Sequence, residues 1–241
     1  MEKILFFSHG DKGGVGKSVV STLAVEYLLN RGDVALVETD PRQPDVAVRY
    51  AGDPGVTVMT SSMNRAGDSE NALTKFGLWL EQEGPDQIIV NLPSGAGETI
   101  DEHSELIRAM ADQLGYRLIV VYSLEKGPVA TGVMIESLKH GLLSVVDPEN
   151  RFVAYPLYKG EPEIFGWYRS VERKQGLVGE IAVPALKSTS ALQKLEATPG
   201  RLAHLTISSP ADWMIVERAS IKRWYEKGLF EIEKVFGKDG E

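Results

Sequence analysis

The chain of 241 residues is 43% hydrophobic and 25% charged, with a formal net charge of −8 and a pI near 5.2. This composition is typical of one globular domain with a substantial core, and the negative charge disfavours a protein that coats DNA by bulk electrostatics. The sequence has no cysteine, which excludes disulfides and thiolate chemistry. It shows neither a signal segment nor a run of about 18 apolar residues, so we expect one cytoplasmic domain over residues 1–241.

The first predicted strand, residues 4–7, leads through a glycine-rich loop into a helical pattern over residues 19–29. Strand, glycine loop and helix in this order are the setting of a phosphate-binding loop, although Asp11 stands where the general motif has glycine. The glycines let backbone N–H groups surround a phosphate, Lys17 would reach the β- and γ-phosphates, and the Ser18 hydroxyl would ligate Mg²⁺. The residues predicted to bind nucleotide here are Gly13, Gly14, Val15, Gly16, Lys17 and Ser18.

Residues 12–18 resemble the deviant Walker A motif of the ParA/MinD family of ATPases. The resemblance implies ATP and Mg²⁺ as ligands and a homodimer that forms around bound ATP. It also implies a catalytic role for Lys12, which would reach across the dimer to the nucleotide of the other subunit. The alternative for Lys12 is an exposed lysine on a loop.

The second predicted strand, residues 34–37, ends at Glu38 and Asp40, and the following segment is similar to the Asp-x-Asp-Pro-Gln segment of the family. A carboxylate at the carboxyl end of such a strand faces the ligand crevice. The resemblance implies that Asp40 orients the attacking water or holds a water of the Mg²⁺ shell. Asp40 followed by proline is also an ordinary turn opener, and the two interpretations are compatible.

Residues 87–91 resemble the Walker B strand, with Asn91 where relatives usually carry aspartate. We therefore expect Asn91 beside Ser18 and Asp40 at the metal site, but as a weaker support because an amide has no negative charge. Val19 is a second departure, since many relatives have threonine there. Both changes could weaken hydrolysis without removing the phosphate cradle.

Strands at residues 118–122, 152–155 and 181–183 alternate with helical patterns at residues 71–82, 102–113 and 129–143. Alternation of this kind predicts a three-layer α/β/α domain with a mostly parallel sheet, which agrees with a P-loop NTPase of the deviant Walker A type. The four histidines show no metal-ligand spacing and are expected on the surface or in loops. They are His9, His103, His140 and His204.

The last third of the chain resembles the TraL-like branch of the family, which is linked to conjugative transfer, in residues 181–187 and 217–230. By this resemblance Pro184 lies near the adenine base. Basic residues at 218, 222, 223 and 227 could form a stripe for DNA phosphates, or a solvated helix face, because acids interleave them. The apolar positions between 221 and 236 suit a membrane-binding helix or, more commonly, one that docks on its own domain.

Together these features predict an ATP-dependent dimerising switch ATPase that positions or segregates DNA, in plasmid partition or conjugation, through slow ATP hydrolysis. Its partners would be a second copy of the chain and DNA or a DNA-bound adaptor. A nucleotide-dependent binding module with little or no hydrolysis is the alternative. A metabolic reductase or ligase of the wider superfamily is a third, and the lack of cysteine rules out a cysteine-ligated cluster for it.

Overall fold

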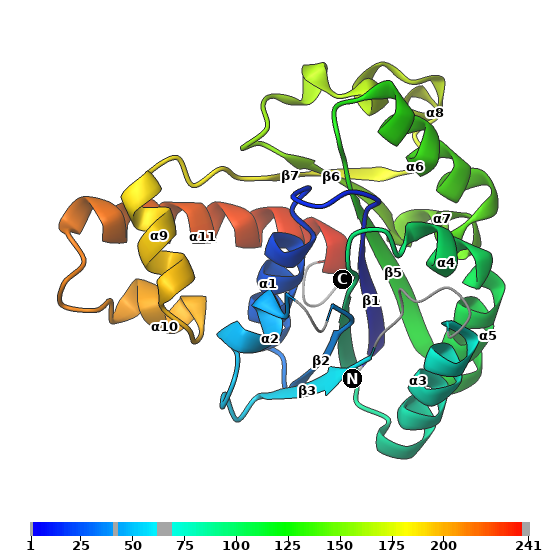
Figure 1. Ribbon diagram of the computed structural model, residues 1–241, viewed down its shortest axis with the longest axis horizontal. Helices are drawn as coiled ribbons and strands as arrows, with labels where there is room; N and C mark the ends of the chain where they lie inside the picture. The colour runs from blue at the N-terminus through cyan, green and yellow to red at the C-terminus, as the bar shows by residue number, and fades with distance from the viewer. Residues whose placement is uncertain (1, 41–42, 62–68, 238–241) are drawn as a thin grey trace.

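Seven parallel strands form the central sheet in the computed structural model, which describes residues 2–40, 43–61 and 69–237 (Figure 1). Their order across the sheet is β3-β2-β4-β1-β5-β6-β7, and every neighbouring pair is parallel. The strands are β1 (Lys3–His9), β2 (Val34–Glu38), β3 (Val56–Thr60), β4 (Gln87–Asn91), β5 (Tyr116–Ser123), β6 (Arg151–Pro156) and β7 (Gly179–Val183).

Helices cover both faces of this sheet, as Figure 1 shows. One face carries α1 (Lys17–Leu28), α2 (Asp45–Arg49), α9 (Thr189–Ala197), α10 (Leu202–Ile207) and α11 (Ile215–Phe236). The other carries α3 (Ser69–Glu83), α4 (Gly97–Glu102), α5 (Ser104–Leu114), α6 (Pro128–His140) and α7 (Leu142–Val145). Shorter elements are η1 (Pro148–Asn150), η2 (Pro162–Ile164), η3 (Gly166–Arg169) and α8 (Val171–Lys174).

The core is divided by the sheet into two apolar clusters, because successive side chains of a strand point to opposite faces. In β1, Ile4 and Phe6 pack under α1 and α11, whereas Leu5 and Phe7 pack under α3 to α7. The central strands are therefore apolar at nearly every position, as expected for a parallel sheet covered on both sides.

The predicted three-layer α/β fold with a parallel sheet is confirmed, and six strands lie where the sequence predicts them. The strand β3 was not predicted, because most of its side chains are exposed or half-buried at the sheet edge. The helix expected over residues 102–113 is interrupted at His103, which separates α4 from α5. The helix expected over residues 129–143 ends at His140, and α7 follows after Gly141.

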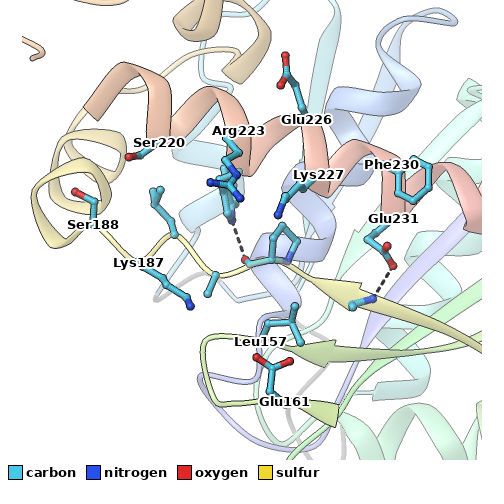
Figure 2. A pocket seen from close by; sticks show the side chains of 15 residues that line it. Leu157, Glu161, Lys187, Ser188, Ser220, Arg223, Glu226, Lys227, Phe230 and Glu231 are labelled. Atoms are coloured by element: carbon cyan, nitrogen blue, oxygen red, sulfur yellow. Dashed lines mark hydrogen bonds between the residues drawn. The ribbon is translucent and has the colours of Figure 1, made fainter. Parts of the chain in front are cut away.

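The long helix α11 docks on the domain through its apolar side, and so it is the self-docking alternative that the structure supports. Gly228 lets it approach α1 closely, since a Cβ there would lie 2.7 Å from the Leu23 side chain. The helix also covers the open edge of β7, where the Glu231 carboxylate accepts the Ala182 N–H at 2.8 Å (dashed in Figure 2). Within the described residues, no helix combines the length and apolar character needed to cross a bilayer.

Candidate nucleotide-binding site

The glycine-rich loop lies at the carboxyl end of β1, between β4 and β5. From β1 the chain crosses to β2 on one side, and after β4 it passes to β5 on the other side of β1. Ligands of open α/β sheets bind outside the carboxyl ends of the strands at such a reversal of strand order. The fold therefore places residues 10–18 at the position where a ligand crevice is expected.

Two glycines give this loop its path into α1. Gly14 and Gly16 have φ angles of 68° and 99°, a region that residues with a Cβ rarely adopt. Gly16 is the N-cap residue of α1, and with no side chain it leaves the first N–H groups of the helix without a side-chain cap. Gly13 and Gly14 are exposed, whereas Val15 is buried and anchors the loop. The N-terminus of this 12-residue helix thus offers donors and a positive dipole end to an anion.

Lys17, the first residue of α1, folds back over the loop and donates from Nζ to the Lys12 carbonyl oxygen at 2.8 Å. The side chain is only 7% exposed, and this burial lowers its pKa to about 8, against the opposing influence of Asp11 and Asp40. A buried ammonium group with one carbonyl acceptor is poorly compensated, so a phosphate group would stabilise its charge.

Lys12 lies exposed at the start of the loop, and its side chain forms no ion pair with any described residue. The pKa of Glu125 is lowered, against the effect of burial, chiefly by its hydrogen bond from Lys159, and the charge of Lys12 adds a smaller contribution. Glu125 itself is paired with Lys159. The exposure of Lys12 fits both a role toward a second subunit and a solvated loop lysine.

A cavity of about 650 Å³ opens beside the loop. Ser18, Val19 and Thr22 of α1 form one wall, and Pro184 and Leu186 after β7 form another. Its volume lies within the range of small-molecule sites. Of the predicted nucleotide contacts, the structure thus brings Ser18 and Pro184 to the same cavity.

Tyr158, in the loop after β6, also lines this cavity and was not singled out from the sequence. Its hydroxyl donates to the Gly14 carbonyl oxygen, and its ring lies against Gly16, where a Cβ would be 3.6 Å from the hydroxyl oxygen. Burial, followed by the charge of Glu125, raises the pKa of Tyr158 to about 12, so the hydroxyl stays protonated as a donor. Tyr158 thereby supports the loop from the cavity side.

Asn91 is buried at the carboxyl end of β4, where its amide is held by two neighbours. Its Oδ1 accepts from the Ser21 hydroxyl at 2.9 Å, and its Nδ2 donates to Glu38 Oε1 at 3.0 Å. Glu38 is the register partner of Asn91 on β2 and is fully buried. Burial raises the pKa of Glu38, although the hydrogen bond from Asn91 acts in the opposite direction, and the second carboxylate oxygen has no hydrogen-bond partner in the described structure.

Asp40 lies half-buried two residues beyond β2, and its Oδ1 accepts the Gln43 N–H at 3.3 Å. Its charge opposes part of the lowering of the Lys17 pKa that burial causes. The hydrogen bond from Gln43 supports the turn interpretation of Asp40, and its role toward water or Mg²⁺ stays a prediction. Residues 41 and 42, which complete the Asp-Pro segment, lie outside the described residues.

His9 corrects the expectation that the histidines lie on the surface or in loops. It ends β1 directly before the glycine loop, is 1% exposed, and packs edge-on against Tyr122. Its Nε2 lies 3.5 Å from Asp101 Oδ1, and that oxygen accepts hydrogen bonds from the Ser137 hydroxyl and the Leu142 N–H. Burial opposes ionisation of Asp101, but His9 and these donors outweigh it and lower the pKa.

A divalent cation would not find a complete set of protein ligands here, because the described residues hold no group of three acidic or histidine side chains that could bind one. Mg²⁺ commonly takes one or two protein oxygens together with waters and substrate phosphates. The Ser18 hydroxyl and the Asp40 carboxylate fit that pattern, whereas Asn91 is already engaged by Ser21 and Glu38.

Comparison with known proteins shows the fold. A scan against protein-family models gives no match. The chain is 24% identical to protein MobD of Acidithiobacillus ferrooxidans over 127 residues, which are 52% of this chain and 53% of MobD. The matched region therefore spans about half the length of that curated relative.

Two solved structures share the fold. The septum site-determining protein MinD of Pyrococcus horikoshii, complexed with Mg-ADP, matches with a TM-score of 0.52 and 13% identity over 98% of each chain. The signal recognition particle receptor FtsY of Elizabethkingia anophelis matches with a TM-score of 0.52 and 13% identity, over 77% of this chain and 60% of FtsY. The protein thus has the parallel α/β fold of these proteins.

Proposed function

We propose that the protein is a nucleotide-dependent switch ATPase that binds Mg-ATP at the carboxyl end of β1. The observation that carries the proposal is the buried Lys17 ammonium, which lies at the N-terminus of α1 inside a glycine loop and beside a cavity of suitable size. The sequence motif, the strand order and the MinD-like fold support the same site.

In this proposal each residue has a defined task. Lys17 exchanges its contact with the Lys12 carbonyl for the β- and γ-phosphates, and the N–H groups at the start of α1 bind phosphate oxygens. Ser18 and Asp40 hold the magnesium ion, which neutralises phosphate charge when bound. Asp40 also orients the attacking water, and Pro184 lines the base cavity. Lys12 is exposed, as a residue that contacts the nucleotide of a second copy must be.

The finer biological role, positioning or segregating DNA in plasmid partition or conjugation, rests on the resemblance of the sequence to ParA/MinD and TraL-like proteins. The likeness to MobD is compatible with it. In this role the ATP-bound homodimer engages DNA or a DNA-bound adaptor, and slow hydrolysis in the cytoplasm returns the monomer.

A binding module with little hydrolysis is the second candidate, and the Asn91 contacts favour it. The amide of Asn91 is neutral and both its ends are engaged by Ser21 and Glu38, so this residue lacks the negative charge that a carboxylate would bring to the magnesium ion. Measured turnover in the wild type and in Asp40→Ala separates the two candidates. An ATPase loses turnover in the variant while keeping ATP, whereas a binding module shows the same negligible turnover in both proteins.

Titration calorimetry with ATP and Mg²⁺ tests the site itself. Lys17→Ala should abolish measurable binding, since it removes the charge paired with the phosphates. Lys75→Ala, on α3 at the other face of the sheet, removes an equal charge from an exposed position and should bind like the wild type. If the folded Lys17→Ala protein bound ATP as tightly as the wild type, the assignment of the glycine loop as the nucleotide site would be wrong.

A further inference from the structure

A second cavity, of about 840 Å³, lies on the far side of the segment that follows β7 (Figure 2). It is a groove between this segment, residues 184–188, and the helix α11, and the loop after β6 closes its floor with Leu157 and Glu161. The proposed nucleotide site makes no use of it. Its lining is mixed, with three cations, three carboxylates and several apolar side chains.

The three cations of the groove form no ion pairs with the residues that the structure describes. Lys187 comes from the segment after β7, and Arg223 and Lys227 come from successive turns of α11. All three are exposed, and none forms an ion pair with a described residue. In Figure 2 the Lys227 ammonium points toward the segment after β7, into the groove.

Two of the three carboxylates do not neutralise these cations. Glu231 accepts the Ala182 N–H and pairs with Lys234. Glu226 lies 3.9 Å from Lys222 and points away from the segment after β7 in Figure 2. Glu161 on the floor is the remaining acid, so the groove keeps an excess of positive charge within a chain of net charge −8.

An exposed aromatic ring completes the chemistry of the groove. Phe230, at the end of the lining, is 61% exposed, and the Lys234 ammonium lies 5.1 Å from its ring centre. Unpaired cations beside an exposed ring suit a segment that carries both carboxylates and apolar side chains. A nucleic acid fits less well, because the bulk charge of −8 repels a polyanion at long range and Glu161 lies within the groove.

The groove and the nucleotide cavity share a wall. Pro184, Leu186 and Trp224 line both, and the Trp224 indole N–H donates to the Pro184 carbonyl oxygen at 2.9 Å. A ligand that displaces this wall from one side therefore changes the shape of the cavity on the other side. Such coupling is reciprocal, because the two ligands must change each other's affinity by the same factor.

We propose that this groove binds an acidic, partly apolar peptide segment of a partner protein, and that its occupancy is coupled to the nucleotide cavity through Pro184, Leu186 and Trp224. The coupling rests on the proposed function, whereas binding of the segment does not. A partner bound in the groove would thus bind one nucleotide state in preference to another, and would change the affinity for the nucleotide.

Fluorescence anisotropy with a labelled peptide of alternating glutamate and leucine tests binding on the full chain. Arg223→Glu/Lys227→Glu should weaken the peptide by about tenfold or more, since two attractions become repulsions. Arg218→Glu/Lys75→Glu is the matched control, because it makes the same charge change at exposed positions outside the groove, pairs with none of its carboxylates in the described structure, and should weaken the peptide far less. No binding by the wild type, or equal losses in both variants, would overturn the proposal. Displacement of the labelled peptide by random duplex DNA at a lower concentration than by unlabelled peptide would also overturn the proposal.

The coupling is measured with a fluorescent ADP analogue. Saturating peptide should change its affinity by about fivefold or more, and saturating nucleotide should change the peptide affinity by the same factor. Trp224→Phe, which removes the donor to Pro184, should reduce this factor, taken as the ratio of the variant's own affinities with and without the second ligand. A factor of one in the wild type overturns the coupling. If the wild type bound peptide but no nucleotide, the proposed function would fail and the coupling with it, while the groove assignment would stand.

Discussion

Replacing Asn91 by aspartate, the residue usual at this position in the ParA/MinD ATPases that the sequence resembles, should destabilise this protein. In the structure the Asn91 amide donates to Glu38 Oε1 at 3.0 Å, and both side chains are buried. Asn91→Asp replaces that donor by a second carboxylate oxygen. Two full charges 3.0 Å apart repel by about 5 kcal/mol at an effective dielectric constant of about 20, and a hydrogen bond to a charged group worth about 1.5–3 kcal/mol is lost.

Proton uptake offers the variant a less costly route. Holding one carboxyl protonated at pH 7, against an ordinary pKa near 4.3, costs about 3.7 kcal/mol and restores a hydrogen bond between the two groups. This is smaller than the repulsion and the lost bond together, so protonation sets the loss of stability at about 3–4 kcal/mol at pH 7. Burial already raises the pKa of Glu38 in the wild type, so the wild type already bears part of the free-energy cost of protonation. The difference in unfolding free energy between the variant and the wild type should therefore be about 3–4 kcal/mol or less.

The pH dependence follows with a definite sign. A carboxyl whose pKa is raised in the folded state contributes stability below its unfolded pKa and loses it as the pH rises through the folded pKa. The loss in Asn91→Asp should therefore shrink by about 1.4 kcal/mol for each pH unit below 7. Urea unfolding at pH 5, 6 and 7 measures it.

The double variant Glu38→Gln/Asn91→Asp provides the matched control. It exchanges the amide and the carboxylate between β2 and β4, so one charge and one amide donor remain at the same place. We expect it to recover most of the stability that Asn91→Asp loses. A single variant as stable as the wild type at pH 7, or a double variant no better than the single one, would refute the contact between Glu38 and Asn91.

Three further predictions concern the loop and the helix packed behind it. Because burial lowers the Lys17 pKa to about 8, ATP binding at pH 8 should take up about half a proton, which calorimetry in buffers of different ionisation enthalpy detects. Lys17→Arg, whose side chain is always charged, should take up none. Zero proton uptake by the wild type would contradict the buried ammonium. Gly228→Val should cost about 1–3 kcal/mol in thermal unfolding because its Cβ meets Leu23, whereas Gly132→Ala on α6 meets nothing and should gain about 0.5–1 kcal/mol. Lys12→Ala should keep the ATP affinity of the monomer and prevent dimerisation with a non-hydrolysable analogue in sedimentation, and a normal dimer would make Lys12 an ordinary loop lysine.

Local patterns in the sequence carry most of the fold, because parallel strands buried on both faces are apolar throughout. Residues 34–37 and 88–90 show this, and the glycine loop lies between a predicted strand and a predicted helix. The edge strand β3 lacks the signal, since only Val56 in it is fully buried. His9 was wrongly expected outside because β1 extends past the apolar run to include it.

The contacts that shape the candidate site were beyond sequence reasoning for a different reason. Tyr158 reaches Gly14 and Ser21 reaches Asn91 across long stretches of chain, so no local pattern joins them. Gly141, between α6 and α7, is a further example, because a Cβ at this position would collide with Asp101, which is distant in the sequence. Such residues are defined by what packs against them after folding.

The position of α11 also determines when the proposed site can form during synthesis. This helix packs on α1, the helix that follows the glycine-rich loop, and Tyr27 donates to the carbonyl oxygen of Gly237. A nascent chain lacking α11 exposes the apolar side of α1 around Leu23 and leaves the edge of β7 open. Since translation supplies the N-terminal segments first, the loop is made early but its supporting helix lacks cover until α11 emerges from the ribosome. If the proposed site binds nucleotide, binding must wait until α11 has been made, and chains truncated before α11 are expected to be substrates for chaperones and proteases.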